Sequence, residues 1–92
     1  MSIAKSLADL NQKIAQAQAE LRIVEEQLLF QMDVVEDTKT RALVAETPLA
    51  DREYRVARDD YARLETQRDE GLRAIADLKA EQDRLLDRML TS

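Results

Sequence analysis

Apolar residues recur along the first half of the chain at alternating intervals of four and three. The repeat covers eight apolar positions: Ile3, Leu7, Leu10, Ile14, Ala17, Leu21, Val24 and Leu28. This heptad pattern is typical of a helix that buries one stripe against a partner helix in a coiled coil. The repeat then weakens and passes through Gln31, Val35, Thr38, Ala42 and Ala45. It predicts one helix over residues 2–45. A bend near residues 37–40 stays open, because that stretch is polar and rich in β-branched residues.

Residues 46–49, near the middle of the chain, separate this repeat from a second one. Thr47 is suited to cap a helix, because its hydroxyl accepts a hydrogen bond from a first-turn amide. Pro48 suits the first helical position, where no amide donor is needed. Asp51 then places a negative charge where the helix dipole favours one. The segment therefore predicts a hard break between two helices.

A second heptad frame follows the break and differs from the first. It runs through Ala50, Tyr54, Ala57, Tyr61, Leu64, Ile75, Leu78, Leu85 and Met89. Continuing the first frame would place charged residues in the seam, so the change of frame independently supports a break. Leu72 beside Gly71 suggests that the second seam shifts locally by about one position. We predict one helical-hairpin domain over residues 1–92, with a turn at residues 46–48 and a second helix over residues 48–90.

A short turn forces the two helices to run antiparallel, so the expected fold is an all-α two-helix hairpin, a long coiled coil. The position of the turn predicts the facing pairs Leu7 with Met89, Leu10 with Leu85, Leu21 with Ile75, Val35 with Tyr61, and Ala42 with Tyr54. It also places Arg41 near Glu53 and Lys13 near Glu81. Such exposed ion pairs contribute only about 0 to 1 kcal/mol each.

Three polar residues fall at seam positions that a coiled coil normally fills with apolar side chains: Gln31, Arg68 and Gln82. Polar seam residues fix the register and the oligomeric state at a cost in stability, and we assign that role to these three. Arg68 is expected to bury its aliphatic stem and to direct its guanidinium towards Glu25 or Glu65.

A second set of apolar residues lies outside the seam. Its members are Ile23, Phe30 and Val34 on the first helix, and Leu72 and Leu86 on the second. Scattered apolar residues are normal on a surface, whereas clustered ones mark a contact surface, and both readings remain open here. We interpret the five as a surface for a second copy or another helical protein. Two hairpins paired in this way would form an antiparallel four-helix bundle.

Composition offers little catalytic chemistry. The chain has no Cys and no His, which removes thiolate ligands, imidazole ligands and the commonest general base. Adjacent carboxylates such as Glu25 and Glu26 fall outside the seam, as is typical of a solvated helix face. Neither a Gly-rich phosphate loop nor a nucleophile elbow is present. We therefore predict a protein that is not an enzyme, with no catalytic residues, no metal site and no cofactor.

The net charge of -5 argues against partners that need a basic face, namely nucleic acids and anionic membranes. The arginines that follow the turn are interleaved with Asp and Glu, which weakens any basic stripe. No apolar run approaches the roughly 18 residues of a membrane span, and the first residues lead into periodic sequence rather than a signal peptide. The expectation is a soluble cytoplasmic protein that binds neither nucleic acid nor membrane.

In outline and length the predicted hairpin resembles the small Trp-x-Gly helical-hairpin proteins exported by type VII secretion. The turn of those proteins carries Trp-x-Gly, whereas residues 46–49 here read Glu-Thr-Pro-Leu and the chain has no Trp. Their Tyr-x-x-x-Asp/Glu signal is matched only by Tyr61 with Glu65, in the middle of the second helix. The likeness is one of outline and does not assign the chain to that family.

Two functions fit these features. The first is a non-enzymatic oligomerisation or adaptor module that acts through protein–protein contacts. The alternative is a small helical chaperone or secretion-associated carrier that clasps a client helix. They differ in whether the apolar surface around Ile23, Phe30 and Val34 is covered in the isolated protein.

Overall fold

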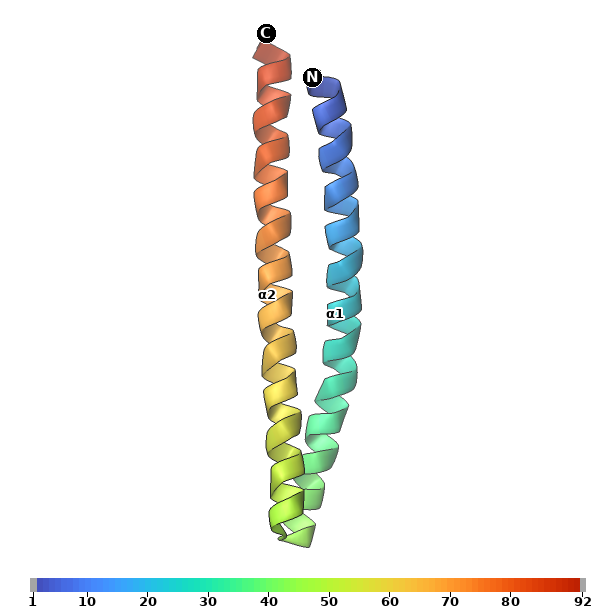
Figure 1. Ribbon diagram of the computed structural model, residues 1–92, viewed down its shortest axis with the longest axis vertical. Helices are drawn as coiled ribbons and strands as arrows, with labels where there is room; N and C mark the ends of the chain where they lie inside the picture. The colour runs from blue at the N-terminus through green and yellow to red at the C-terminus, as the bar shows by residue number, and fades with distance from the viewer. Residues whose placement is uncertain (1, 92) are drawn as a thin grey trace. The chain divides into compact units, whose positions relative to one another are not determined.

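The computed structural model describes residues 2–91. They form two helices, α1 (Ile3–Ala45) and α2 (Pro48–Thr91), which run antiparallel and pack against each other (Figure 1). No strand occurs within the described range. The structure therefore confirms the all-α helical hairpin. The expected helix boundaries agree with the observed ones to within one residue.

Contacts divide the hairpin into two compact units. The first, which we call the terminal unit, joins the start of α1, up to Arg22, to the end of α2, from Asp69 onwards. The second, which we call the turn unit, comprises residues Ile23–Arg68 and includes the connection between the helices. Each unit is an antiparallel pair of helical segments.

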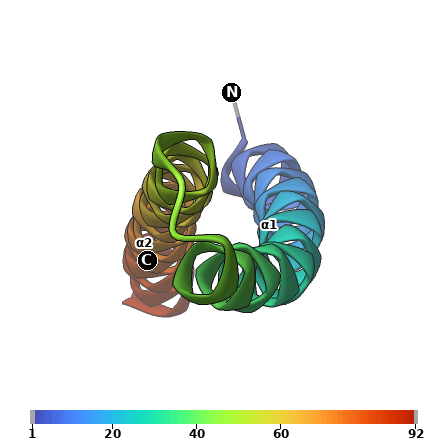
Figure 2. The ribbon, with the colours of Figure 1, turned by 90° about the horizontal axis from the view of Figure 1, so that it is seen from below.

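The connection has the geometry that its residues predict. Glu46 directly follows α1 and has a φ of 51°, the left-handed conformation in which many helices end. Its amide donates a hydrogen bond to the Ala42 carbonyl over 3.2 Å. Thr47 caps α2, because its hydroxyl accepts the Ala50 N–H at 3.2 Å and its carbonyl accepts the Asp51 N–H at 3.1 Å. Only these two residues separate the helices, and Figure 2 shows the chain crossing between them.

α1 continues without a break through residues 37–40. The sequence alone allowed either a bend or a continuous helix in this stretch. The Thr38 hydroxyl donates to the Val34 carbonyl at 2.7 Å and lies 3.0 Å from that of Val35. The Thr40 hydroxyl donates to the carbonyl of Glu36 at 3.1 Å. These hydroxyls find acceptors within the helix itself, so the polar stretch needs no hydrogen-bond partner outside α1.

The buried seam follows the two predicted heptad frames. Its buried residues are Leu28, Thr38, Ala42, Ala50 and Ala57 in the turn unit, and Leu10, Ile14 and Ile75 in the terminal unit. The second frame passes straight through Gly71, which faces α1, while Leu72 is 51% exposed. The predicted shift of the seam at this point is therefore wrong. The frame only looked interrupted because glycine contributes no side chain.

The contacts between the helices agree with some of the predicted facing pairs and differ from one of them. In the terminal unit, the side chain of Leu21 lies against Gly71, whereas the sequence paired Leu21 with Ile75. In the turn unit, the predicted pair Val35 and Tyr61 line one hollow together.

Replacing Gly71 with alanine should raise the free energy of unfolding by about 1 kcal/mol, because glycine costs about that much inside a helix. A Cβ at this position would lie 3.5 Å from the Leu21 Cδ1, an ordinary van der Waals distance. Urea unfolding followed by circular dichroism measures the change. Gly71→Leu is the control, because a larger side chain overfills the seam and should lower stability. A less stable Gly71→Ala would contradict the observed helix spacing.

Candidate functional site

Many large apolar side chains of the hairpin are exposed rather than buried between the helices. Within residues 2–91, seven apolar residues are buried, three of them alanines, whereas twelve large apolar residues are exposed. A pair of helices buries only a thin stripe of surface, and contiguous apolar surface outside it marks a contact site. The exposed apolar residues, and not a polar pocket, therefore form the candidate functional surface.

Near the connection, the buried residues of the turn unit's seam are small, and the half-buried Tyr54 is the large seam residue beside them. Four buried residues lie there, with exposed fractions of 4 to 8%: Thr38, Ala42, Ala50 and Ala57. Small side chains let two helices approach closely, but they leave no room in the seam for larger neighbours. The larger apolar residues of this region consequently lie on the flanks of the helix pair.

One flank of the turn unit collects five of these exposed apolar residues together with the half-buried Val34. We call it the valine flank and define it by Ile23, Phe30, Val34, Val44, Leu49 and Val56. On α1, Ile23, Phe30 and Val44 are separated by multiples of seven residues, and Val34 lies one turn after Phe30. On α2, Leu49 and Val56 are seven residues apart. Each helix therefore presents its members on one face.

Two adjoining hollows connect the α1 and α2 sides of the valine flank. The first, of about 320 Å³, is lined by Val34 from α1 and by Leu49 and Val56 from α2. The second, of about 350 Å³, lies nearer the connection and is lined by Val44 and Leu49. Leu49 and Glu53 line both hollows, so the two hollows adjoin each other. We call the two hollows together the groove.

Charged residues of opposite sign border this groove from the two helices. Arg41 lies on the α1 side, with its guanidinium 2.9 Å from Asp37 and 3.8 Å from Glu53 across the groove. The α2 side carries Arg52, Glu53 and Asp60, and Asp60 is ion-paired with Arg63. The Arg41–Glu53 contact confirms that expected ion pair. Lys13 and Glu81, in the terminal unit, form no such pair.

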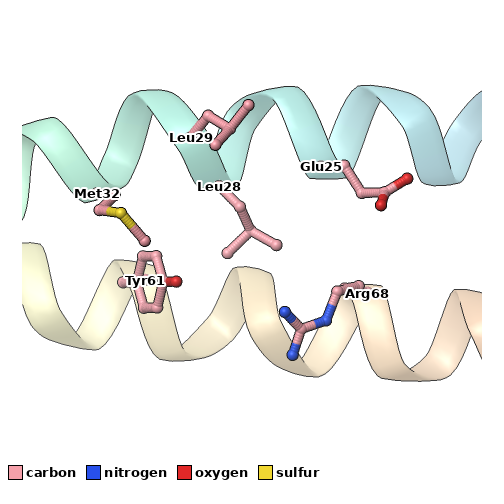
Figure 3. A pocket seen from close by; sticks show the side chains of 6 residues that line it. All are labelled: Glu25, Leu28, Leu29, Met32, Tyr61 and Arg68. Carbon is pink, nitrogen blue, oxygen red and sulfur yellow. The ribbon is translucent and has the colours of Figure 1, made fainter.

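The opposite flank of the turn unit is also apolar, and we call it the methionine flank. It is defined by Leu28, Leu29, Met32 and Tyr61, which line a hollow of about 310 Å³. Figure 3 shows Leu28 pointing between Tyr61 and Arg68, with the Met32 side chain directed towards Tyr61. Glu25 and Arg68 complete the lining of this hollow.

The predicted polar seam residues lie between the helices, and two of them bridge α1 and α2. In the turn unit, the Gln31 Nε2 donates to the Ala57 carbonyl over 3.1 Å. In the terminal unit, the Gln82 Nε2 donates to the Asn11 side-chain oxygen. Arg68 keeps 34% of its side chain exposed and places its guanidinium 3.9 Å from Glu65. Each polar group thus has a partner, which limits the cost of its partial burial.

The structure divides the five predicted surface residues between the two units. Ile23, Phe30 and Val34 lie in the turn unit, whereas Leu72 and Leu86 lie in the terminal unit, each directly after a seam residue of α2. The sequence missed three members of the valine flank: Val44, Leu49 and Val56. Their spacing was the available signal, because Leu49 and Val56 are one heptad apart and each directly precedes a seam alanine.

No known protein family, no characterised protein and no solved structure matches this chain. Across the described range, no three carboxylates come together in a group that could hold a metal ion. Neither helix, over residues 2–91, is apolar enough along its length to cross a membrane.

Replacing Arg68 with leucine should raise the melting temperature and make the protein less uniform in mass or helix orientation. Leucine fills a seam position without the cost of partly burying a guanidinium, and it removes a polar group that restricts how helices pair. Thermal circular dichroism and light scattering measure the two effects. Arg55→Leu, at an exposed position of α2, is the matched control. An unchanged melting temperature with one unchanged mass would mean that Arg68 specifies nothing.

Proposed function

We propose that this chain is a non-catalytic helical module that acts by protein–protein association, with a second copy of itself as its first partner. The valine flank is the observation that carries this proposal. Phe30, within it, is 72% exposed, and the neighbouring groove is lined by aliphatic side chains from both helices. Two hairpins that face each other through this flank would form a four-helix bundle, the architecture in which paired hairpins bury such faces.

The energetics favour association through apolar burial. Burying one large apolar side chain stabilises by about 1.5 to 3 kcal/mol, and a two-fold dimer buries each flank residue twice. The exposed ion pairs of the flank contribute about 0 to 1 kcal/mol each. Apolar contact therefore supplies the stabilisation of the dimer. Leu72 and Leu86 offer the terminal unit a further surface for the same role, or for another helical protein.

A second candidate function is supported by the methionine flank. A hollow lined by Leu28, Leu29 and Met32 suits a client helix, because unbranched methionine adapts to differently shaped apolar partners. A chaperone or carrier would keep this flank free and bind its client there. The two functions place the working surface on opposite flanks of the turn unit, so one pair of substitutions separates them.

Phe30→Glu should lower both the particle mass and the melting temperature, because it would bury an unpaired carboxylate in the interface between copies. Leu29→Glu is the matched control. Leu29 is 68% exposed, against 72% for Phe30, but it lies on the methionine flank. Light scattering and thermal circular dichroism at micromolar concentration measure both variants, and Leu29→Glu should leave mass and melting temperature unchanged.

Equal masses for Phe30→Glu and the unsubstituted protein would contradict self-association through the valine flank. Binding of hydrophobic dyes separates the carrier function. A monomer that binds such dyes, and loses that binding in Leu29→Glu but not in Phe30→Glu, would favour the carrier over the self-associating module.

A further inference from the structure

We propose that two copies pair through their valine flanks with both turns at the same end, so that α1 of each copy lies over α2 of the other. This inference rests on the proposed self-association and adds the orientation of the partner. It follows from the distribution of charge and of apolar residues between the two helices of the turn unit.

The charges on the flank distinguish which helices face each other. Arg52, Glu53 and Asp60 line the groove from α2, so that side carries a net negative charge, whereas Arg41 lines the groove from α1. Packing α2 on α2 of a second copy would set two sides of net negative charge against each other. Packing α1 on α2 sets Arg41 over the side of net negative charge instead. Charge complementarity selects orientation in this way even where each pair contributes little affinity.

The apolar residues agree with the same exchange of helices. Arg41 lies 3.8 Å from Glu53, so these two residues stand at one level of the hairpin. Val44 and Leu49 line one hollow together and lie closer to the connection than Arg41 and Glu53 do. If α1 of one copy lies over α2 of the other with these levels kept, Val44 faces Leu49 of the second copy and Arg41 faces its Glu53. Apolar residues then meet apolar residues, and opposite charges meet.

Symmetry converts this pairing into an orientation. A closed dimer of identical chains has a two-fold axis. For two flat helix pairs packed face to face with aligned helices, an axis perpendicular to the helices places α1 on α1 and α2 on α2. Only an axis parallel to the helices places α1 on α2. That axis leaves both turns at the same end of the turn-unit bundle.

Distances between spin labels on the two copies test this orientation. The chain has no cysteine, so one introduced cysteine carries one label. Glu26→Cys, Asp33→Cys and Thr40→Cys are suitable sites, because all three are exposed on α1 of the turn unit and stand seven residues apart on one face. Each singly labelled chain is measured as its own dimer by pulsed electron paramagnetic resonance.

With both turns at the same end, the three distances between labels should agree to within a few ångströms, because each is set by the width of the bundle alone. With the turns at opposite ends, each seven-residue step away from the crossing point changes the separation along the axis by about 20 Å, twice the rise of seven helical residues. Distances that change in this way along the three sites would overturn the proposed orientation.

The outcomes for orientation and for self-association are distinguishable. A dimer with unequal distances keeps the proposed function and removes the orientation. A labelled protein with the mass of a monomer, and with no distance between copies at any of the three sites, overturns both and leaves the valine flank to a different partner.

Discussion

The close approach of the two helices beside the connection determines what the turn unit presents to its surroundings. The buried residues of that part of the seam are alanines and a threonine, with the half-buried Tyr54 beside them, and the connection consists of two residues. The seam there holds little apolar volume, so Val34, Leu49 and Val56 remain beside it and line a groove. A seam of larger residues would separate the helices and bury more of the apolar surface within one chain. The narrow seam and the exposed flank are thus two consequences of the same small residues.

The heptad spacing was sufficient to predict both helices, the break between them and the polar seam positions, because these depend on local propensity and periodicity. It also predicted the Arg41–Glu53 and Val35–Tyr61 pairings, but not the contact between Leu21 and Gly71, which depends on how the two helices are aligned. Gly71 shows a second limit of the heptad pattern. Glycine has no side chain, so it looks like an interruption of the apolar repeat, although its position in α2 faces α1.

The candidate surface was predictable only in part. Phe30 and Val34 were found because their helix has a clear apolar excess beside its seam. Leu49 and Val56 are isolated large apolar residues on the flank of their own helix, and only the antiparallel packing brings them beside Val34. The same packing assigns Leu72 and Leu86 to a different unit. Residues on one helix face follow from spacing, whereas surfaces shared between helices require the register.

Different interactions act within one chain and between chains. The Gln31 side chain holds α1 to the backbone of α2 within one chain, and the apolar flank provides the surface for a second chain. The central claim is that a second copy covers that flank in solution, and Phe30, the only phenylalanine of the chain, reports on it directly. Fluorine NMR of protein labelled with fluorophenylalanine, with a soluble paramagnetic probe, measures its exposure. Self-association through the valine flank predicts that Phe30 is protected from the probe at high protein concentration and loses this protection on dilution. Full exposure at every concentration would contradict it.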